Sequence, residues 1–484
     1  MSKVLLNGLV FAVVIVCFAL VPATSTTQGP EPTRHAPPPQ EKPNILFILT
    51  DDLDARSTSR MPKLENRLAE RGTTFDQAFA TTPQCCPARA SFLTGKYAHN
   101  HTVLTNDEEE GGAFKFRSSG EDESTMATRL DKRGYETILI GKYLNYYDGT
   151  YIPPGWDRWH GQIGRNNDEH EYNVNGTIKY FDPDVFHDTD LFSDWAAKYI
   201  RRGAGKERPF FMYLSVNAPH GPAIPAERHK DEFPGIKVPR PPSFNERDMG
   251  DKVRWVRTGP RFSGKEVREM DSLYRDRLRS MLSVDDMIGR LVKELGKNGE
   301  LDNTYIVFTS DHGFHMGQHR LEPGKGRPYE EDIEIPLYVR GPGVPEGRTL
   351  GHKVLNLDFA PTFAELGGAE PPASVDGRSF APVLGDRLPS ASSWRESFLV
   401  EFYHHDPFSM VRTGRYSYVE YEAGERELYD LKADPYQLRS LHGSPQHQKV
   451  MDDLHARLLA LKNCSGQDSC EAAERTDETH TSQR

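Results

Sequence analysis

The sequence predicts an α/β protein: a large mixed, mostly parallel sheet sandwiched by helices, with a smaller C-terminal domain of antiparallel sheet plus helix. Five short, continuous apolar runs recur along the chain, with helical or loop segments between them. Strands of a parallel sheet that is covered by helices are buried on both faces, so they form such runs instead of alternating patterns. Near Asp376 this rhythm changes to short strand-like runs separated by turn glycines.

The large domain contains the five apolar runs. They are expected as strands at Asn44–Leu49, Glu136–Ile140, Pro209–Val216, Thr304–Thr309 and Pro336–Val339. Helices are expected between them at Pro62–Arg71, at Ser124–Arg133 and from about Lys265 to Leu295. The first two helices are followed by Gly72 and Gly134, and glycine readily adopts the left-handed conformation that ends a helix. Strands that alternate with helices are the pattern of an α/β domain.

The small C-terminal domain begins where the strand-like runs become shorter. Its expected strands are Phe398–Tyr403, Ser409–Thr413, Ser417–Tyr421 and Glu427–Tyr429, and one amphipathic helix is expected at Gln446–Leu461. Gly414 and Gly424 lie between strands and favour tight turns. The chain therefore divides into a large domain, a small C-terminal subdomain and a polar tail, over residues 44–385, 386–463 and 464–484.

The N-terminus has the pattern of a secretory signal peptide. An apolar run from Val4 to Val21 follows a lysine, and Ala23 is a small residue suited to cleavage. An uncleaved membrane anchor is the alternative, because about 18 apolar residues can just span a bilayer, but Asn7 and Gly8 weaken that interpretation. We expect a signal peptide over 1–23 and a Pro-rich linker over 24–43. The mature protein would be secreted or periplasmic, with no stable membrane association after cleavage.

Charge and composition exclude one class of partner. The 484 residues include 60 Lys plus Arg and 71 Asp plus Glu, a formal net charge of −11. A nucleic-acid-binding protein normally carries a basic face, and no long block of basic residues occurs here. We therefore expect no nucleic-acid partner.

The cysteines fall into two close pairs with different expected roles. Of five cysteines, one lies in the expected signal peptide, which leaves Cys85 next to Cys86, and Cys464 near Cys470. An exported protein would plausibly oxidise the second pair. Adjacent cysteines rarely form a disulfide with each other, and the first pair has no obvious partner elsewhere. That pair is therefore expected to serve a purpose other than cross-linking.

Polar and charged residues follow four of the expected strands. They are Asp51 and Asp52, Lys142, His220, and Asp311 with His312. Ligands of open α/β sheets bind beyond the carboxyl ends of the strands, so these side chains are expected at one site. Neighbouring carboxylates repel one another unless a cation lies between them. Oxygen ligands favour Ca²⁺ or Mg²⁺, although a histidine would also tolerate zinc. A single Asp at a strand end is more often a helix cap or turn former, but four coincident strand ends argue for a site.

The segment Cys85–Lys96 resembles the signature of type I sulfatases. It contains the pattern C-x-P-x-R followed by L-T-G-K, which constrains several residue types over twelve positions. Asn44–Asp52 and Thr309–Gln318 resemble the two metal-binding segments of that family, which belongs to the alkaline-phosphatase-like superfamily. Lys142, His220 and Lys325 occur in the family's order, and the resemblance extends from residue 44 to residue 435.

The resemblance implies a covalent mechanism. In type I sulfatases a formylglycine-generating enzyme converts the first cysteine of the signature to formylglycine, so Cys85 would be the precursor of the nucleophile. The hydrated aldehyde has two hydroxyls on one carbon. One attacks sulfur and releases the alcohol, and the other then loses its proton, so that sulfate is expelled and the aldehyde is restored.

The resemblance also implies roles for individual residues. One divalent cation, Ca²⁺ or possibly Mg²⁺, would be held by Asp51, Asp52, Cys85, Asp311 and His312. Arg89 would hold the hydrated side chain, and Lys142 and Lys325 would neutralise the sulfate oxygens. His220 would donate a proton to the leaving alcohol.

Two departures from the broad family bear on the substrate. Ala88 replaces a common serine of the signature, and Tyr143–Asn145 follows Lys142 where many arylsulfatases have a second histidine. The segment Gly141–Asn145 and the double-cysteine segment Cys85–His101 look more like N-acetylglucosamine-6-sulfatases and heparan-directed endosulfatases. They imply a 6-O-sulfate of a glucosamine-type sugar as substrate. The alternatives are a generic arylsulfatase, a phosphate or phosphonate ester hydrolase, and a sulfated-glycan-binding protein without turnover. Cys85 favours a sulfatase, because phosphatases of this fold normally have Ser or Thr at that position.

Overall fold

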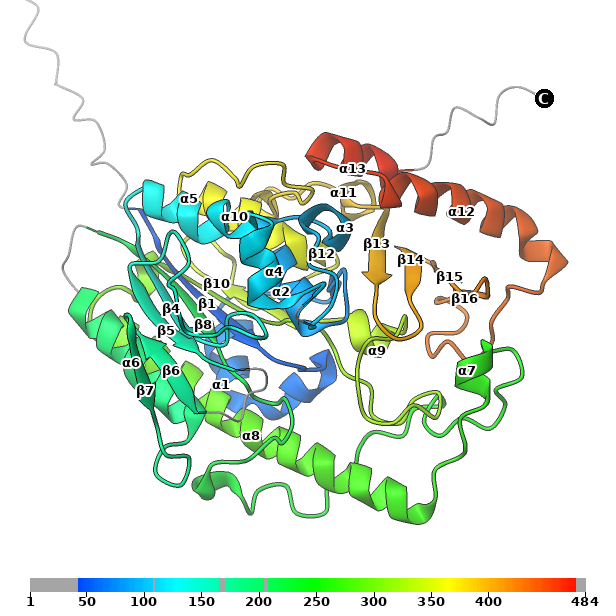
Figure 1. The fold of residues 1–484 in the computed structure, drawn as a ribbon, viewed down its shortest axis with the longest axis horizontal. Coiled ribbons are helices and arrows are strands. Elements are labelled where there is room, and N and C mark those ends of the chain that lie inside the picture. Colours follow the sequence, from blue (N-terminus) through cyan, green and yellow to red (C-terminus); the bar gives the residue numbers. More distant parts are fainter. Residues whose placement is uncertain (1–41, 108, 165–169, 204–207, 476–484) are drawn as a thin grey trace, which may run out of the picture. The chain divides into compact units, whose positions relative to one another are not determined.

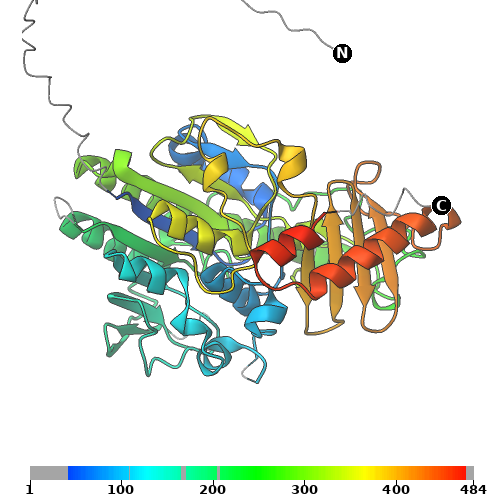
Figure 2. The same ribbon diagram turned by 90° about the horizontal axis from the view of Figure 1, so that it is seen from above.

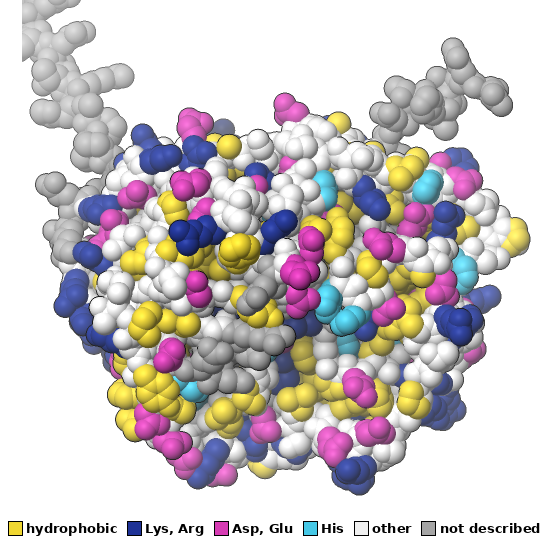
Figure 3. Space-filling view, in the orientation of Figure 1, with side chains coloured by type: hydrophobic (Ala, Val, Ile, Leu, Met, Phe, Trp, Pro, Cys, Tyr) yellow, Lys and Arg dark blue, Asp and Glu magenta, His cyan; other side chains and the backbone are white. Residues whose placement is uncertain are grey.

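The computed structural model describes residues 42–107, 109–164, 170–203 and 208–475. The expected signal peptide over 1–23 and nearly all of the expected linker over 24–43 lie outside the described residues. Within the described ranges, no helix combines the length and the apolar character that a bilayer span requires. On the face shown in Figure 3, acidic and basic side chains are interspersed, and no sign of charge dominates.

A ten-stranded mixed sheet forms the centre of the molecule, in the order β11-β2-β10-β9-β1-β8-β4-β5-β6-β7 (Figure 1). Its strands are β1 (Asn44–Thr50), β2 (Thr73–Phe75), β4 (Glu136–Gly141), β5 (Arg158–Gln162), β6 (Glu171–Val174), β7 (Thr177–Tyr180), β8 (Phe210–Ser215), β9 (Thr304–Ser310), β10 (Leu337–Arg340) and β11 (Arg348–Leu350). The five central strands β9, β1, β8, β4 and β5 are parallel. A short pair, β3 (Ala78–Phe79) and β12 (Val354–Leu355), lies apart from this sheet.

Helices cover both faces of the sheet, as the buried strands require. All seven residues of β1 are buried, and alternate side chains enter two different cores. Phe47 packs on one face against Phe92, Phe359 and Phe363. That face is covered by α2 (Cys85–Thr94), α5 (Met126–Lys132) and α10 (Phe359–Leu366). The other face is covered by α1 (Pro62–Leu64), α6 (Asp188–Gly203) and α8 (Gly264–Lys297).

The C-terminal residues form a second, four-stranded antiparallel sheet. Its strands are β13 (Ser397–Phe402), β14 (Phe408–Thr413), β15 (Tyr416–Tyr421) and β16 (Arg426–Asp430), and the helices α12 (Gln448–Lys462) and α13 (Gln467–Ala473) follow them. Helix α12 lies across this sheet, and the shorter α13, red in Figure 2, packs against α12 beside the sheet. The smaller helices are α3 (Ala98–His101), α4 (Gly112–Ser118), α7 (Arg254–Arg257), α9 (Glu330–Ile333) and α11 (Ala391–Trp394). The two sheets and their helices confirm the predicted fold class.

Several details differ from the expectation. The run at Pro336–Val339 forms β10, but this strand is antiparallel to β9. The helix expected over 62–71 is a short α-helix that continues as a π-helical turn at Glu65–Ala69. The disulfide between Cys464 and Cys470 agrees with the expectation, but the polar tail expected from residue 464 is helical at its start, and α13 packs so that Glu474 is buried. This segment is polar in sequence, yet it packs on the domain because the buried Glu474 is paired with Arg378 and Arg395.

Candidate active site

The four central strands place the predicted polar residues at one edge of the sheet. β1 pairs in parallel with β8 and with β9, and β8 pairs in parallel with β4, so all four strands end on the same side. The residues that follow them are Asp51 and Asp52 after β1, Lys142 after β4, His220 in the loop after β8, and Asp311 with His312 after β9. Asp52 adopts a left-handed backbone conformation with φ 68°, which an aspartate tolerates better than most residues.

Helix α2 brings Cys85 into this group, because Cys85 is its first residue. The Cys85 Sγ lies 3.4 Å from Asp51 Oδ1, 3.4 Å from His312 Nε2 and 2.9 Å from Lys325 Nζ. All ten residues of α2 are buried, and Gly95 ends the helix with φ 77°. The start of a helix carries a partial positive charge, so an anion bound beside Cys85 would be stabilised.

The carboxylates are buried and surrounded by cations. Burial alone would raise the pKa of Asp51, but Lys142, His220 and Arg89 hold it well below its ordinary value. The pKa of Asp52 is lowered to about 2, because the cations led by Lys325 outweigh the effect of burial. Lys142 Nζ lies 2.5 Å from Asp51 Oδ2, and Lys325 Nζ lies 2.5 Å from Asp52 Oδ1. Both aspartates are therefore ionised at neutral pH.

The donor atoms also fit a divalent cation. In one group, a ligand atom from each of Asp51, Cys85, Asp311 and His312 lies within 4.8 Å of the others. In a second group, the same holds for Asp51, Asp52, Cys85 and His220. Two ligands of one Ca²⁺ ion, each at about 2.3–2.6 Å from it, are at most about 5 Å apart. Each group therefore offers two carboxylates, one imidazole and the Cys85 sulfur, and the carboxylate oxygens suit Ca²⁺ or Mg²⁺; Asp52 and Asp311, both predicted as ligands, fall in different groups.

His312 is held in the tautomer that a metal ligand needs. Its Nδ1 donates to the carbonyl of Gly313 at 2.9 Å, which leaves Nε2 directed at Asp52 Oδ1, 3.3 Å away. Burial lowers the pKa of His312, but Asp311 and the Cys85 thiol raise it to about 9. A proton and a cation would therefore compete for this nitrogen.

Arg89 contacts the carboxylates of both Asp51 and Asp311. Its side chain is fully buried, and its Nε donates to Asp311 Oδ2 at 3.0 Å while its Nη2 lies 3.7 Å from Asp51 Oδ2. Its Nη1 donates to Ser215 Oγ at 2.7 Å. These bonds fix Asp51 and Asp311 relative to α2, which carries Cys85.

His220 lies at the solvent side of the group. Its side chain is 27% exposed, and its Nε2 lies 3.8 Å from Asp52 Oδ2. Its Nδ1 donates to the carbonyl of Gly221 at 2.8 Å, which orients the ring. A histidine that reaches both solvent and the reacting centre is suited to proton transfer to a leaving group.

One contributor was missed by the sequence analysis. Arg277 on α8 is buried; its Nη2 donates to the backbone carbonyl of Asp52 at 2.5 Å, and its Nη1 to that of Pro219 at 3.1 Å. Its guanidinium also lies over the Phe314 ring, 3.9 Å from the centroid. It therefore contacts the loops that follow β1, β8 and β9. No local pattern distinguishes this arginine from others on the long helix, so only the tertiary structure identifies it.

An aspartate, a histidine and the second cysteine of the signature lie outside this group. Asp285 accepts hydrogen bonds from the backbone of Lys63 and Leu64, which is a structural role. His404 pairs with Asp107, and neither belongs to the metal-compatible groups found among the described residues. Cys86 is buried in the apolar core of the α2 face.

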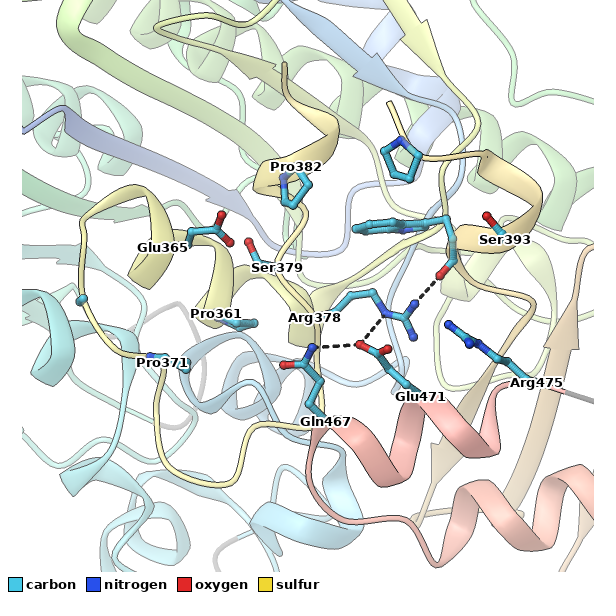
Figure 4. A pocket seen from close by; sticks show the side chains of 13 residues that line it. Pro361, Glu365, Pro371, Arg378, Ser379, Pro382, Ser393, Gln467, Glu471 and Arg475 are labelled. Atoms are coloured by element: carbon cyan, nitrogen blue, oxygen red, sulfur yellow. Dashed lines mark hydrogen bonds and ion pairs between the residues drawn. The ribbon is translucent and has the colours of Figure 1, made fainter. Parts of the chain in front are cut away.

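A cavity of about 580 Å³ is lined by none of these residues (Figure 4). It lies between α10, α11 and α13, and Arg378 projects into it. Arg378 Nε lies 3.6 Å from Glu471, which also accepts a hydrogen bond from Gln467 at 2.9 Å. The volume of this cavity is large enough for a small-molecule ligand. We assign the site to the group around Cys85 instead, because the convergent cations, carboxylates and thiol occur there.

The class that the comparisons define is that of ester hydrolases of the sulfatase fold. Within that class, the chain belongs to the sulfatase family of sulfuric ester hydrolases. The Sulfatase family model matches residues 43–369, and the model described as N-sulphoglucosamine sulphohydrolase, C-terminal, matches residues 319–464.

Two curated relatives illustrate the relationship. The chain is 39% identical over 371 residues to an extracellular sulfatase SULF-1 homolog of Drosophila melanogaster. The aligned region covers 75% of the chain but only 33% of the fly protein. It is 32% identical over 477 residues to an N-acetylglucosamine-6-sulfatase of Capra hircus. That aligned region covers 88% of the chain and 84% of the goat protein. The chain therefore spans about a third of the fly protein and most of the goat protein.

Solved structures share the fold. A protein in complex with its substrate D-glucosamine-2-N,6-O-disulfate superposes with a TM-score of 0.72 and 26% identity, over 90% of this chain and 100% of that chain. A phosphonate monoester hydrolase from Silicibacter pomeroyi superposes with a TM-score of 0.68 and 24% identity, over 86% and 94% of the two chains. The fold by itself therefore does not distinguish sulfate from phosphonate esters.

Proposed function

We propose that this protein is an exported sulfatase that hydrolyses the 6-O-sulfate of a glucosamine or N-acetylglucosamine unit, with formylglycine derived from Cys85 and one bound divalent cation. The observation that carries the proposal is the position of the Cys85 Sγ. It lies 3.4 Å from both Asp51 and His312 and 2.9 Å from the Lys325 ammonium. A nucleophile formed there would face a cation site on one side and a lysine on the other.

Each chain residue has a role that its position supports. Asp51, Asp52, Asp311 and His312 would hold the cation, which polarises the sulfate and lowers the pKa of a hydroxyl bound to it. The formylglycine hydrate supplies one hydroxyl to displace the alcohol and a second to release sulfate. The lysines Lys142 and Lys325 would balance the charge of the sulfate oxygens. Burial lowers the pKa of both lysines but their carboxylate partners raise it, so both stay protonated.

His220 would donate a proton to the departing sugar oxygen. A ring nitrogen of His220 lies within 4.8 Å of the Cys85 sulfur, and the side chain reaches solvent. A sugar alkoxide is a poor leaving group, so proton donation matters more for a sugar ester than for an aryl ester. Arg89 would hold the carboxylates of Asp51 and Asp311 in place while His220 protonates the leaving group.

The sugar assignment rests on similarity. The goat relative is an N-acetylglucosamine-6-sulfatase, and a solved neighbour holds a 6-O-sulfated glucosamine. Export is supported by the apolar run at Val4–Val21 and by the fly relative, which is described as extracellular. N-terminal sequencing of secreted protein should give a chain that begins directly after Ala23.

A substrate panel tests the proposal. We expect cation-loaded protein to release sulfate from N-acetylglucosamine-6-sulfate, and to hydrolyse 4-nitrophenyl sulfate much faster than a 4-nitrophenyl phosphonate ester. Replacing His220 with Ala should reduce the sugar reaction more than the aryl reaction. Hydrolysis of the aryl sulfate alone would identify a generic arylsulfatase, and preference for the phosphonate would contradict the sulfatase assignment.

A further inference from the structure

A cavity of about 360 Å³ opens beside His220. It lies between the loop that follows β8, the beginning of α6 and the middle of α8, and its lining includes Phe186, Asp188, Asn217 and Ile224. Binding sites for small molecules have volumes of about 300–1,000 Å³, so one sugar ring fits.

His220 connects this cavity to the reacting centre. It forms part of the cavity wall, and a ring nitrogen of the same side chain lies within 4.8 Å of the Cys85 sulfur. The carbonyl of Ala218, another lining residue, accepts a hydrogen bond from the backbone N–H of Asp51 at 3.3 Å. A leaving group that receives its proton from His220 can therefore extend into the cavity.

Two buried polar atoms of the wall are unpaired hydrogen-bond acceptors within the described structure. Asn217 donates through Nδ2 to Asp188 at 3.2 Å, and its buried Oδ1 has no partner among the described residues. His187 donates through Nε2 to the carbonyl of Ile224 at 3.2 Å, so the neutral ring leaves Nδ1 as an acceptor, and this atom is also buried and unpaired within the described structure. Two unpaired acceptors favour a ligand that supplies O–H or N–H groups.

The fixed charges of the wall are carboxylates. Among the described residues that line the cavity there is no lysine or arginine, whereas Asp184 and Asp188 are both present, Asp188 beside His170 at 3.2 Å, and the other lining histidines are His187 and His220. A second sulfate placed beside Asp184 would be repelled by its carboxylate, and no lysine or arginine of the described lining would offset that repulsion. At the rim, Phe186 is 44% exposed and Ile224 is 64% exposed, so an apolar sugar face can pack there.

We propose that this cavity binds the leaving sugar and selects a ring that bears hydroxyl and amide N–H groups over one that carries an additional sulfate. This inference rests on the proposed sulfatase function, and it names the substrate that the function would prefer. N-acetylglucosamine-6-sulfate has the required donors, and its acetamido group is uncharged. Glucosamine-2-N,6-O-disulfate, the substrate bound in the neighbouring structure, would place an N-sulfate against the acidic wall.

The kinetic test compares two substrates and a matched pair of variants. We expect kcat/KM of the cation-loaded protein to be at least about tenfold higher for N-acetylglucosamine-6-sulfate than for glucosamine-2-N,6-O-disulfate. Asp184→Lys should reduce that ratio by at least about threefold, since it adds a cation to the wall. Glu171→Lys is the control, because Glu171 is exposed on β6 and does not line the cavity, so it should leave the ratio unchanged.

A second pair of variants tests the apolar rim. Phe186→Ala should raise KM for the monosulfated sugar by about threefold to tenfold, whereas Val185→Ala should not, although Val185 is 69% exposed and adjacent in sequence. Equal hydrolysis of the two sugars by the unmodified chain, or equal effects of Asp184→Lys and Glu171→Lys, would overturn the proposal.

Calorimetric titration makes the test independent of turnover. We expect N-acetylglucosamine to bind more tightly than N-sulfoglucosamine, and Asp184→Lys to reduce or reverse that order. Loss of hydrolysis on every sulfate ester together with this binding order would refute the proposed function while supporting the cavity assignment. Hydrolysis without this binding order would refute the cavity assignment alone.

Discussion

Cys85 and Cys86 are neighbours in the chain but occupy different chemical environments. Cys85 faces Lys325, Asp51 and His312, whereas the Cys86 side chain packs in the apolar core. Burial raises the pKa of the Cys86 thiol to about 12, so it stays protonated and unreactive. The same helix therefore presents one cysteine to the site and the other to the core.

This contrast predicts which cysteine is modified. Protein from a host with a formylglycine-generating enzyme should carry the aldehyde at Cys85 and an unmodified Cys86. Mass spectrometry of the tryptic peptide Gly72–Arg89 measures this directly. Cys85→Ala should abolish hydrolysis, and the matched Cys86→Ala should retain most of it and cost about 1 kcal/mol of stability. A fully active protein with only thiols in this peptide would refute the mechanism.

The carboxylates give a second prediction at this scale. Asp51→Asn and Asp311→Asn should each reduce the bound Ca²⁺ and the hydrolysis rate together, because each removes a charged ligand. Asp285→Asn is the control: Asp285 is equally buried, but it caps the backbone at Lys63 and should affect stability without affecting metal content. The metal-to-protein ratio is measured by elemental analysis after gel filtration. Full activity of verified metal-free protein would rule out the cation.

At the scale of elements, the long helix α8 positions the loops of the site. Arg277 is the point of contact, since it donates to the backbone carbonyls of Asp52 and Pro219. Replacing it with Met removes two charge-assisted hydrogen bonds, each worth about 1.5–3 kcal/mol. We expect kcat for aryl sulfate to fall at least about tenfold, with Arg277→Lys restoring part of the rate.

The control for α8 lies two residues away. Arg275 donates to the carbonyl of Ile236 at 3.1 Å, and Ile236 packs against the apolar cluster of Val238 and Met270, so Arg275→Met should leave kcat within about twofold. Circular dichroism and a urea midpoint for each variant separate lost positioning from lost folding. If both arginine variants lose activity in proportion to stability, then Arg277 has only a structural role.

The elements also show what a single sequence can predict. The strands β1, β4, β8 and β9 were predicted to within two residues at each end, because strands buried on both faces have continuous apolar runs. Their shared edge then predicted the clustering of Asp51, Lys142 and His312. The direction of β10, the strands β5 to β7 and the contribution of Arg277 depend on tertiary contacts that leave no local pattern.

At the scale of the whole molecule, the C-terminal segment is attached to the helix that follows the signature. His99 on α3 bonds Glu401 of β13 through Nδ1 and the carbonyl of Cys464 through Nε2, each at 3.0 Å. Both partners can only accept hydrogen bonds, so both ring nitrogens donate and the imidazole is protonated. This contact links the large domain, the small sheet and the disulfide loop.

The link predicts how stability depends on pH. Burial lowers the pKa of His99, but Glu401 raises it from 6.5 to about 9, while His99 in turn lowers the pKa of the buried Glu401 despite desolvation. A raised histidine pKa stabilises the fold fully below about pH 6.5 and loses this effect as pH rises through about 9. The Glu401 contribution is present at neutral pH and is lost on acidification. The contact should therefore be strongest between about pH 5.5 and 7.

Urea unfolding of His99→Gln tests this prediction. Relative to the unmodified chain, we expect the variant to lose about 2–3 kcal/mol of stability at pH 6, and the difference to shrink steadily towards pH 9.5. In a Glu401→Gln background the same substitution should cost much less, since the charged partner is gone. His455→Gln provides the control: its ring is 40% exposed beside Glu420, so solvent weakens that pair and the substitution should have little effect at any pH. A His99→Gln deficit that stays constant from pH 6 to pH 9.5 would show that packing, and not the protonated imidazole, attaches the C-terminal segment.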